Sequence, residues 1–130
     1  DQIASRRSVS ILHTEAALAA ALAALDRPEL YLVEGFFEGS GVGVSILAAE
    51  GEILQAFQHH RVLESGPTGG STYRVSAALD PALEQATAAL ARAAALHGVA
   101  MFEFRRNMAT GQFVLLEVNA RFWGSLPLAI

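Results

Sequence analysis

Two carboxylates, an amide and a guanidinium lie close together near the end of the chain and are its best candidates for chemistry. Glu103 stands in one apolar segment, and Glu117, Asn119 and Arg121 stand in and just after the next. Crowding such groups at one edge of a sheet is costly if their role is only structural, because buried polar groups need partners. The cluster therefore indicates a site for a metal ion or another charged ligand.

The surrounding segment, Met101–Ser125, predicts two antiparallel strands joined by a polar turn at Asn107–Gly111. A register that places the apolar side chains of both strands on one face fixes which residues lie opposite one another. That register sets Glu103 opposite Glu117, with both carboxylates on the face away from the core. The apolar sets are Phe102 and Phe104 on the first strand, and Val114, Leu116 and Val118 on the second.

Two carboxylates directly opposite each other destabilise a sheet unless something neutralises them. At about 4 Å and an effective dielectric constant of about 20, the repulsion is on the order of 4 kcal/mol. Either one carboxyl group stays protonated or a cation lies between the two. Mg²⁺ commonly takes one or two carboxylates together with phosphate oxygens. The residues alone leave a metal site and a solvated polar face as equal alternatives.

Composition sets limits on the kind of protein. The chain has 130 residues, enough for one domain with a core, and a net charge of −4 that argues against a nucleic-acid partner. Without cysteine it can form neither disulfides nor thiolate metal sites. No apolar run is long enough to span a bilayer and no secretory signal is visible, so a cytoplasmic protein that does not enter membranes is predicted. We expect a fragment, since the chain starts without methionine and stops inside an apolar segment.

Local patterns predict the other elements. Thr14 is expected to cap a helix that runs to Leu25, and Asp80-Pro81 to start another that runs to His97. The glycine-rich run at 39–43 is interpreted as a flexible turn, His59 and His60 as exposed residues at a strand end, and the loop at 65–71 as mobile. Strands are predicted at 8–13, 31–37, 42–48, 52–61 and 73–77.

Three segments resemble the ATP-grasp superfamily, and they occur in the order that the family has. They are LVEGFFEG at Leu32–Gly39, GVAMFEF at Gly98–Phe104 and LEVNAR at Leu116–Arg121, of which the E-x-N-x-R ending is the most specific. The strings FQHHR, PTGG and NARFWGSLPLAI are similar to the carboxylate–amine ligase and carbamoyl-phosphate-synthase-like branch. The resemblance covers most of the chain.

The resemblance implies an α+β fold: a partial ATP-grasp fold whose mostly antiparallel sheet has helices packed on one face. Residues 1–37 would be a remnant of the small lobe that ends in the adenine hinge, and residues 38–130 would be the C-terminal lobe with the metal-binding hairpin. ATP and Mg²⁺, or Mn²⁺, would be the cofactors.

The resemblance also implies roles for individual residues. Glu103 and Glu117 would bind the metal and the nucleotide phosphates, with Asn119 as a third oxygen ligand. Glu34 would accept a hydrogen bond from the adenine amino group, and the backbone of Phe36 and Phe37 would form the hinge beside the ring. Arg121 and Arg61 would be the catalytic pair, the first at the transferred phosphoryl group or acyl-phosphate and the second, with the loop at 67–71, near the phosphates or the carboxylate substrate.

The implied activity is that of an ATP-dependent ligase acting on a small carboxylate and an amine, with the remainder of the ATP-grasp protein as partner. The family places a lysine on its small lobe, and this chain has none, so the isolated chain is expected to have little activity. Where many relatives carry a ribose-binding acid, this sequence has Gly41. The alternatives are a non-catalytic assembly module and an ATP-grasp kinase or carboxylase. Exposed sheet in such a fragment would favour a homodimer.

Overall fold

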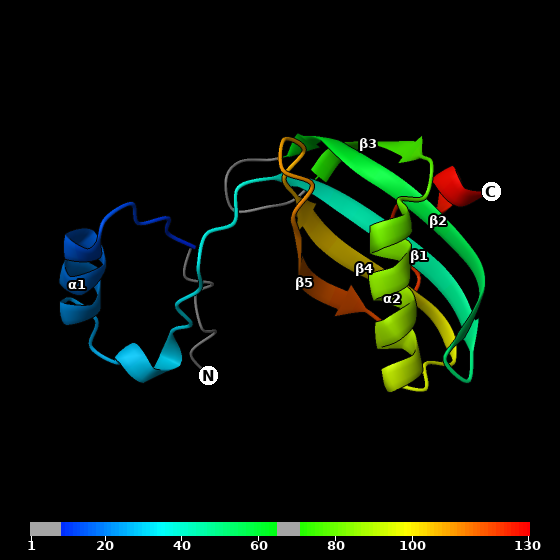
Figure 1. The fold of residues 1–130 in the computed structure, drawn as a ribbon. Coiled ribbons are helices and arrows are strands. Elements are labelled where there is room, and N and C mark those ends of the chain that lie inside the picture. Colours follow the sequence, from blue (N-terminus) through cyan, green and yellow to red (C-terminus); the bar gives the residue numbers. More distant parts are fainter. Residues whose placement is uncertain (1–8, 65–70) are drawn as a thin grey trace.

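A computed structural model describes residues 9–64 and 71–130 and shows one sheet of five strands. The strand order is β3-β2-β1-β4-β5, and all four neighbouring pairs are antiparallel, as predicted (Figure 1). In the described part of the chain, no helix is long and apolar enough to cross a bilayer. The elements are α1 (Glu15–Ala23), a 3₁₀ turn η1 (Pro28–Leu30), β1 (Ser40–Ala49), β2 (Glu52–Glu64), β3 (Ser71–Ala77), α2 (Pro81–Ala93), β4 (Gly98–Arg106), β5 (Phe113–Asn119) and η2 (Leu126–Ala129).

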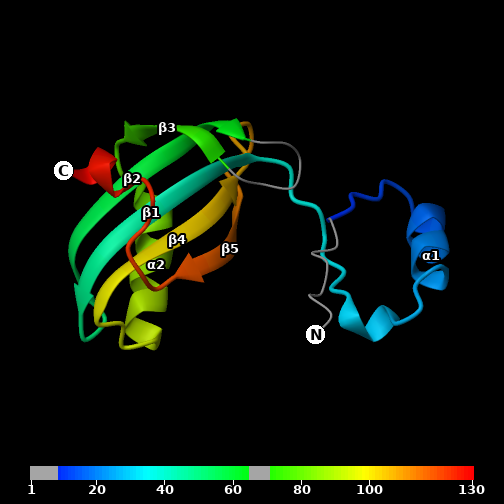
Figure 2. The same ribbon diagram turned by 180° about the vertical axis from the view of Figure 1, so that it is seen from behind.

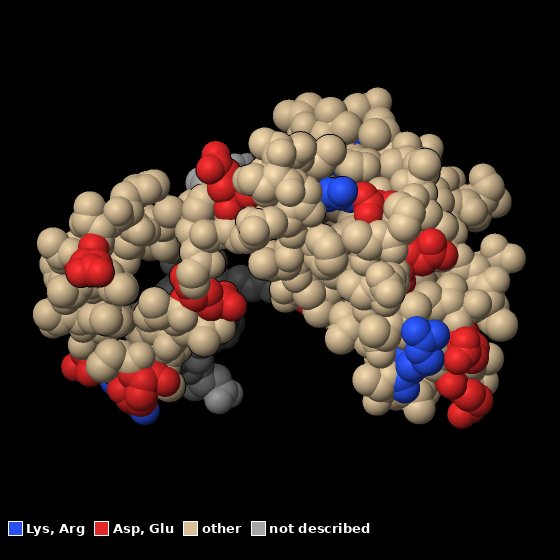
Figure 3. Space-filling model, in the orientation of Figure 1, with Lys and Arg blue, Asp and Glu red and all other residues tan. Residues whose placement is uncertain are grey.

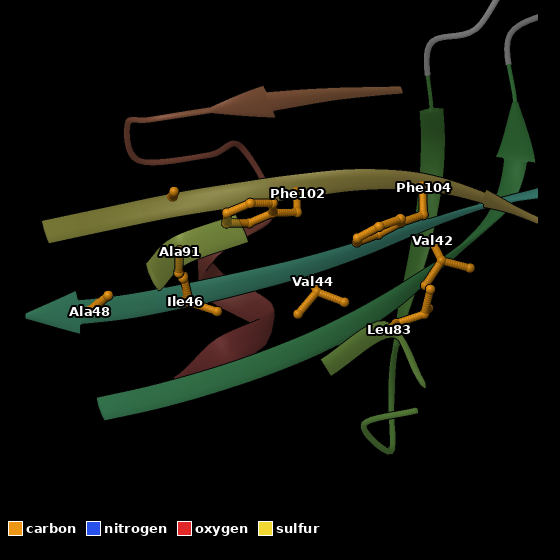
Figure 4. Close-up of a cluster of buried hydrophobic side chains, with 9 residues drawn as sticks. Val42, Val44, Ile46, Ala48, Leu83, Ala91, Phe102 and Phe104 are labelled. Carbon is orange, nitrogen blue, oxygen red and sulfur yellow. The ribbon is translucent and has the colours of Figure 1, made fainter. Parts of the chain in front are cut away.

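The core lies between the sheet and α2. Every second side chain of β1 and β4 points to α2, because strand side chains alternate between faces. From α2 itself, Leu83, Thr87 and Ala91 are buried, whereas Leu90 is 39% exposed. The buried apolar side chains, most of them labelled in Figure 4, are Val42, Val44, Ile46, Ala48, Leu83, Ala91, Ala100, Phe102 and Phe104.

Polar contacts fix both ends of α2. The Asp80 carboxylate accepts from the amides of Ala82 and Leu83, as predicted for an N-cap, and it also forms an ion pair with Arg106 of β4. The prediction that the helix runs to His97 is wrong. Instead the chain turns at Ala95, whose φ of 45° is left-handed. This turn lets Leu96 pack against the core and accept a hydrogen bond from the Gly51 amide at 2.8 Å.

The N-terminal part of the described chain has less regular secondary structure than predicted. Thr14 caps α1 as expected, and its hydroxyl accepts from Ala17 at 3.1 Å. However, residues 9–13 and 31–38 form no strand, so both strand predictions fail there. A strand needs a neighbour for its backbone groups, and within the described residues these apolar segments have none: Leu32 is 82% exposed. No residue of α1 is buried, and Figures 1 and 2 show it apart from the sheet.

Two glycines predicted to form a flexible turn lie within β1. A Cβ atom on Gly41 would lie 2.4 Å from Cδ of Arg61, and one on Gly43 would lie 2.2 Å from Cε1 of His59. Neither position has room for a side chain, because side chains of β2 lie across the backbone of β1. Gly41 and Gly43 therefore leave space on the surface of the sheet, and the side chains of Arg61 and His59 occupy it.

The two faces of the sheet differ in character. The face that carries α2 shows few charged groups, and they are scattered (Figure 3). The opposite face is in front in Figure 2, where the segment after β5 crosses the sheet toward β2 and β3. On that face the cross-strand register aligns His59, Gly43, Glu103 and Glu117 in one row over four strands. We call this side the polar face.

Candidate metal and nucleotide site

The hairpin of β4 and β5 places Glu103 directly opposite Glu117, which confirms the predicted register. Beyond this pair the register shifts, so that Phe104 lies opposite Leu115 rather than Leu116. The prediction that Val114, Leu116 and Val118 share one face is therefore wrong. A bulge of this kind bends a strand and redirects its side chains, and bulges are common beside functional sites.

Glu103 already has a cationic partner. The Arg61 guanidinium reaches over Gly41 and forms an ion pair with the Glu103 carboxylate. The two side chains are only 10% and 11% exposed. Two opposed acids were predicted to need a cation beside them, and Arg61 of β2 is that cation in this structure. The predicted catalytic arginine and the predicted metal ligand are thus in direct contact.

The residues that follow Glu117 form a short chain of hydrogen bonds. The Asn119 amide nitrogen donates to Oε1 of Glu117 at 2.9 Å, and the Arg121 guanidinium donates to Oδ1 of Asn119 at 3.2 Å. Arg121 also donates to the backbone oxygen of Phe122 at 3.1 Å. These bonds hold an amide and a guanidinium beside the exposed Glu117 carboxylate.

The donor set suits a hard divalent cation. Glu103 and Glu117 offer carboxylate oxygens, and Asn119 offers an amide oxygen, all on or beside one hairpin. Mg²⁺ and Mn²⁺ prefer such oxygen ligands and accept phosphate oxygens for the rest of their shell. Within residues 9–64 and 71–130, no three His, Cys, Asp or Glu side chains converge on one point. With two carboxylates and one amide, the rest of such an ion's shell would come from other ligands.

A second ion pair borders the site. Arg105 of β4 lies opposite Gly41 on the polar face, and its guanidinium bonds to the Glu64 carboxylate at 3.2 Å. Arg105 also donates to the backbone oxygen of Gly39, and Glu64 accepts from the Gly41 amide at 3.2 Å. Arg105 and Glu64 therefore tie the start of β1 to its neighbouring strands.

His59 is a residue of this face that the sequence argument placed wrongly. It was expected to be exposed, but it is fully buried against Gly43, with its ring centroid 6.4 Å from that of Phe57. Burial, as the largest cause, and the charges of Arg74 and Arg61 together lower the pKa of His59 to about 4. Neither ring nitrogen has a hydrogen-bond partner among the described residues. The sequence signal that could have found it is the glycine opposite it in β1.

The C-terminal segment adds a cavity to the same face. Trp123 and Ser125 are buried there, at 9% and 6% exposure. The cavity beside them has a volume of about 370 Å³, within the usual range for small-ligand pockets. Its mostly apolar lining includes Ser45 and Phe57, which form the register pair next to Gly43 and His59.

The predicted adenine-binding residues lie away from this cluster. Glu34 and Phe36 belong to the irregular, exposed segment between η1 and β1, and Phe37 is half-buried in it. The structure therefore brings together Glu103, Glu117, Asn119, Arg121 and Arg61, but not the three hinge residues. Residues 67–70 of the loop expected near the phosphates lie outside the described residues, as does most of the loop at 65–71 that was predicted to be mobile.

Comparison with known proteins identifies the fold. No protein-family model and no curated protein matches the sequence. An L-amino acid ligase from Bacillus licheniformis matches with a TM-score of 0.57 and 21% identity, over 72% of this chain and 24% of that one. The D-alanine–D-alanine ligase from Bacillus anthracis, complexed with ATP, matches with a TM-score of 0.51 and 16% identity, over 85% of this chain and 39% of that one. The chain has part of an ATP-grasp fold.

Both neighbours are ATP-grasp carboxylate–amine ligases, as the sequence resemblance implied. The predicted α+β class with an antiparallel sheet is confirmed. At these identities the likeness shows the fold and not the reaction. This chain spans well under half of either ligase, so the activity of a whole protein is a matter for proposal.

Proposed function

We propose that this chain is the C-terminal part of an ATP- and Mg²⁺-dependent ligase that activates a carboxylate for attack by an amine. The observation that carries the proposal is the cross-strand pair Glu103 and Glu117, with Asn119 beside it, on an ATP-grasp sheet. In this proposal residues 1–37 belong to the small lobe and residues 38–130 to the C-terminal lobe. The remainder of the protein supplies the lysine that this chain lacks, and the reaction runs in the cytoplasm, where ATP is available.

The roles of the acids follow from their contacts. Glu103 and Glu117 are the proposed carboxylate ligands of Mg²⁺ or Mn²⁺, and Asn119 is the proposed amide ligand. When bound, the ion neutralises charge on the phosphoryl oxygens of ATP. Without an ion, Arg61 neutralises Glu103 and holds its side chain in place. The pair is therefore stable in both conditions, which a bare pair of opposed carboxylates would not be.

The proposed reaction has two steps. A carboxylate oxygen of the substrate attacks the γ-phosphorus of ATP, and the bond from that phosphorus to the β,γ-bridging oxygen breaks, so that ADP leaves. The amine nitrogen then attacks the acyl carbon of the acyl-phosphate, inorganic phosphate leaves, and the nitrogen loses a proton to give an amide. Arg121 and Arg61 stabilise the charge that develops on the phosphoryl oxygens. Stabilising such charge is usually the largest contribution that a protein makes to the rate of these transfers.

The hinge residues complete the nucleotide site in this proposal. The Glu34 carboxylate accepts from the adenine amino group, and the backbone of Phe36 and Phe37 lies beside the ring. All three are in a segment without strand neighbours, and Phe36 is 66% exposed. They are therefore accessible to a ligand and to the missing part of the small lobe.

Trapping the activated intermediate tests the proposal. The longer protein that carries this chain is incubated with MgATP, hydroxylamine and a panel of amino acids, and ADP and hydroxamate are measured. Carboxylate-dependent formation of both is the expected result. ADP without hydroxamate would favour a kinase, and bicarbonate-dependent ADP release a carboxylase. An absence of turnover with every carboxylate would favour the non-catalytic assembly module. The isolated chain is expected to show little activity in the same assay.

A further inference from the structure

Arg61 and Glu103 bind each other in this structure, although the proposed function gives each of them a different ligand. Their ion pair is nearly closed to water, since the two side chains are 10% and 11% exposed. In the proposed function Glu103 binds a metal ion and Arg61 binds phosphoryl oxygens. While the two residues hold each other, neither can give its full charge to such a ligand. The contact therefore blocks both halves of the site at once.

A single ion pair holds the Arg61 guanidinium in this position. β1 lies between β2 and β4, so the Arg61 side chain must cross β1 to reach Glu103. It crosses at Gly41, where a Cβ atom would lie 2.4 Å from Cδ of the arginine. Among the described residues, Arg61 forms an ion pair with no other carboxylate. The guanidinium can therefore turn away from Glu103 once each of the two charges has another partner.

Each end of the ion pair has a second group of the same sign beside it. Arg74 lies directly opposite Arg61 in the β2–β3 register, and Glu117 lies directly opposite Glu103 in the β4–β5 register. Residues directly opposite in an antiparallel pair project from the same face, and like charges placed there repel. When the ion pair opens, the polar face is positive over β2 and β3 and negative over β4 and β5.

A ligand of one sign opens the ion pair only at the expense of the other charge. A metal ion alone takes Glu103 and leaves Arg61 unpaired beside Arg74. A phosphate alone takes Arg61 and leaves Glu103 unpaired beside Glu117. Leaving one charge of a nearly buried ion pair without a partner is strongly unfavourable. A cation that already carries phosphates provides both partners together, because Glu103 exchanges Arg61 for the ion while Arg61 exchanges Glu103 for a phosphate oxygen.

We propose that the Arg61–Glu103 ion pair is an autoinhibitory contact, which opposes binding of free divalent cations and of metal-free phosphates and opens for the complex of the two. The inference rests on the proposed function, in which the same residues bind the metal and the phosphates. It adds a regulation of that site: occupation of Glu103 by a cation and occupation of Arg61 by an anion favour each other. Such a coupling is reciprocal, so it can be measured from either side.

Binding of Mn²⁺ alone tests the cation side. Free Mn²⁺ is measured by electron paramagnetic resonance during titration of the full chain without nucleotide. We expect Arg61→Met to bind Mn²⁺ at least tenfold more tightly than the parent chain. Arg74→Met is the matched control, because it removes the same charge from the residue opposite Arg61 and leaves the ion pair intact; its affinity should change less than twofold. Equal affinities in Arg61→Met and the parent, or equal gains in the two variants, would overturn the proposal.

Binding of metal-free pyrophosphate tests the anion side, and it does not require Arg61→Met to fold. Inorganic pyrophosphate is titrated into the full chain by calorimetry in the presence of a chelator. Glu103→Gln frees Arg61 from its carboxylate and should bind pyrophosphate at least tenfold more tightly than the parent chain. Glu117→Gln removes the neighbouring charge and keeps the ion pair, so it should change the affinity less than twofold. An unchanged affinity in Glu103→Gln, or the same gain in both variants, would contradict the inference.

Binding of MnATP separates a failure of the inference from a failure of the proposed function. If MnATP binding depends on Glu117, but Arg61→Met and the parent chain bind Mn²⁺ alone equally, only the inference fails. If MnATP binding ignores Glu117, the proposed function fails, and the inference that rests on it fails with it.

Discussion

Replacing Arg61 by methionine removes the guanidinium that neutralises Glu103 and keeps most of the apolar stem that lies over Gly41. The Glu103 side chain is 11% exposed, and Glu117 stands directly opposite it. Removing one partner of a buried ion pair typically costs about 3–5 kcal/mol, because the other charge stays buried and unpaired. We expect the free energy of unfolding of Arg61→Met at pH 7 to fall by about 3 kcal/mol, the lower end, because Glu117 itself is exposed to water.

Urea denaturation with and without a divalent cation isolates the cause. At pH 7, added Mg²⁺ or Mn²⁺ should restore part of the loss, because the ion replaces the missing cation. Arg92→Met removes an arginine from the exposed surface of α2 and should change stability little. An Arg61→Met chain as stable as the parent at pH 7, or equally weakened with and without the ion, would refute this account of the pair.

Two other predictions concern the residues under the polar face. Gly43→Ala should lower the free energy of unfolding by roughly 1–3 kcal/mol in urea denaturation, because its Cβ would lie 2.2 Å from Cε1 of the buried His59. Gly35→Ala is the control, because a Cβ there would have no atom within 4 Å. Equal losses of stability in the two variants would contradict the packing argument. The pKa of His59 is about 4 in the fold against about 6.5 in the unfolded chain, so its neutral form is favoured by folding. The free energy that this pKa difference adds to folding, about 3 kcal/mol, is complete above pH 6.5 and is lost as the pH falls toward 4. The urea concentration at the denaturation midpoint should therefore fall less steeply between pH 7 and pH 4 in His59→Asn than in the parent chain. Equal slopes in the two proteins would show that His59 is not the cause.

The hairpin could be predicted from the sequence because local information is enough to place it. Apolar alternation on both strands and the polar turn fix the register, and Asn107 at the turn accepts from the amides of Ala109 and Thr110. The opposed carboxylates followed directly from that register. The bulge after Glu103 did not, because one extra residue in β5 leaves no mark in the apolar pattern.

The parts that failed depend on which segments become neighbours. Residues 31–37 have the composition of a strand, but a strand forms only beside another one, and the described chain offers none there. The contact of Arg61 with Glu103 requires β1 to lie between their strands and to carry Gly41 at the crossing point. The burial of His59 depends in the same way on Gly43. These pairings arise from the strand order, which a single sequence does not specify.

Calorimetry with MgATP tests the central claim most directly. The proposed longer protein that carries this chain is compared with its Glu117→Gln variant and with Glu84→Gln, which changes an exposed acid on the far face, in α2. We expect MgATP binding that requires the metal, falls at least tenfold in Glu117→Gln and stays unchanged in Glu84→Gln. Equal, metal-dependent affinities in all three proteins would show that the hairpin acids do not hold the ion.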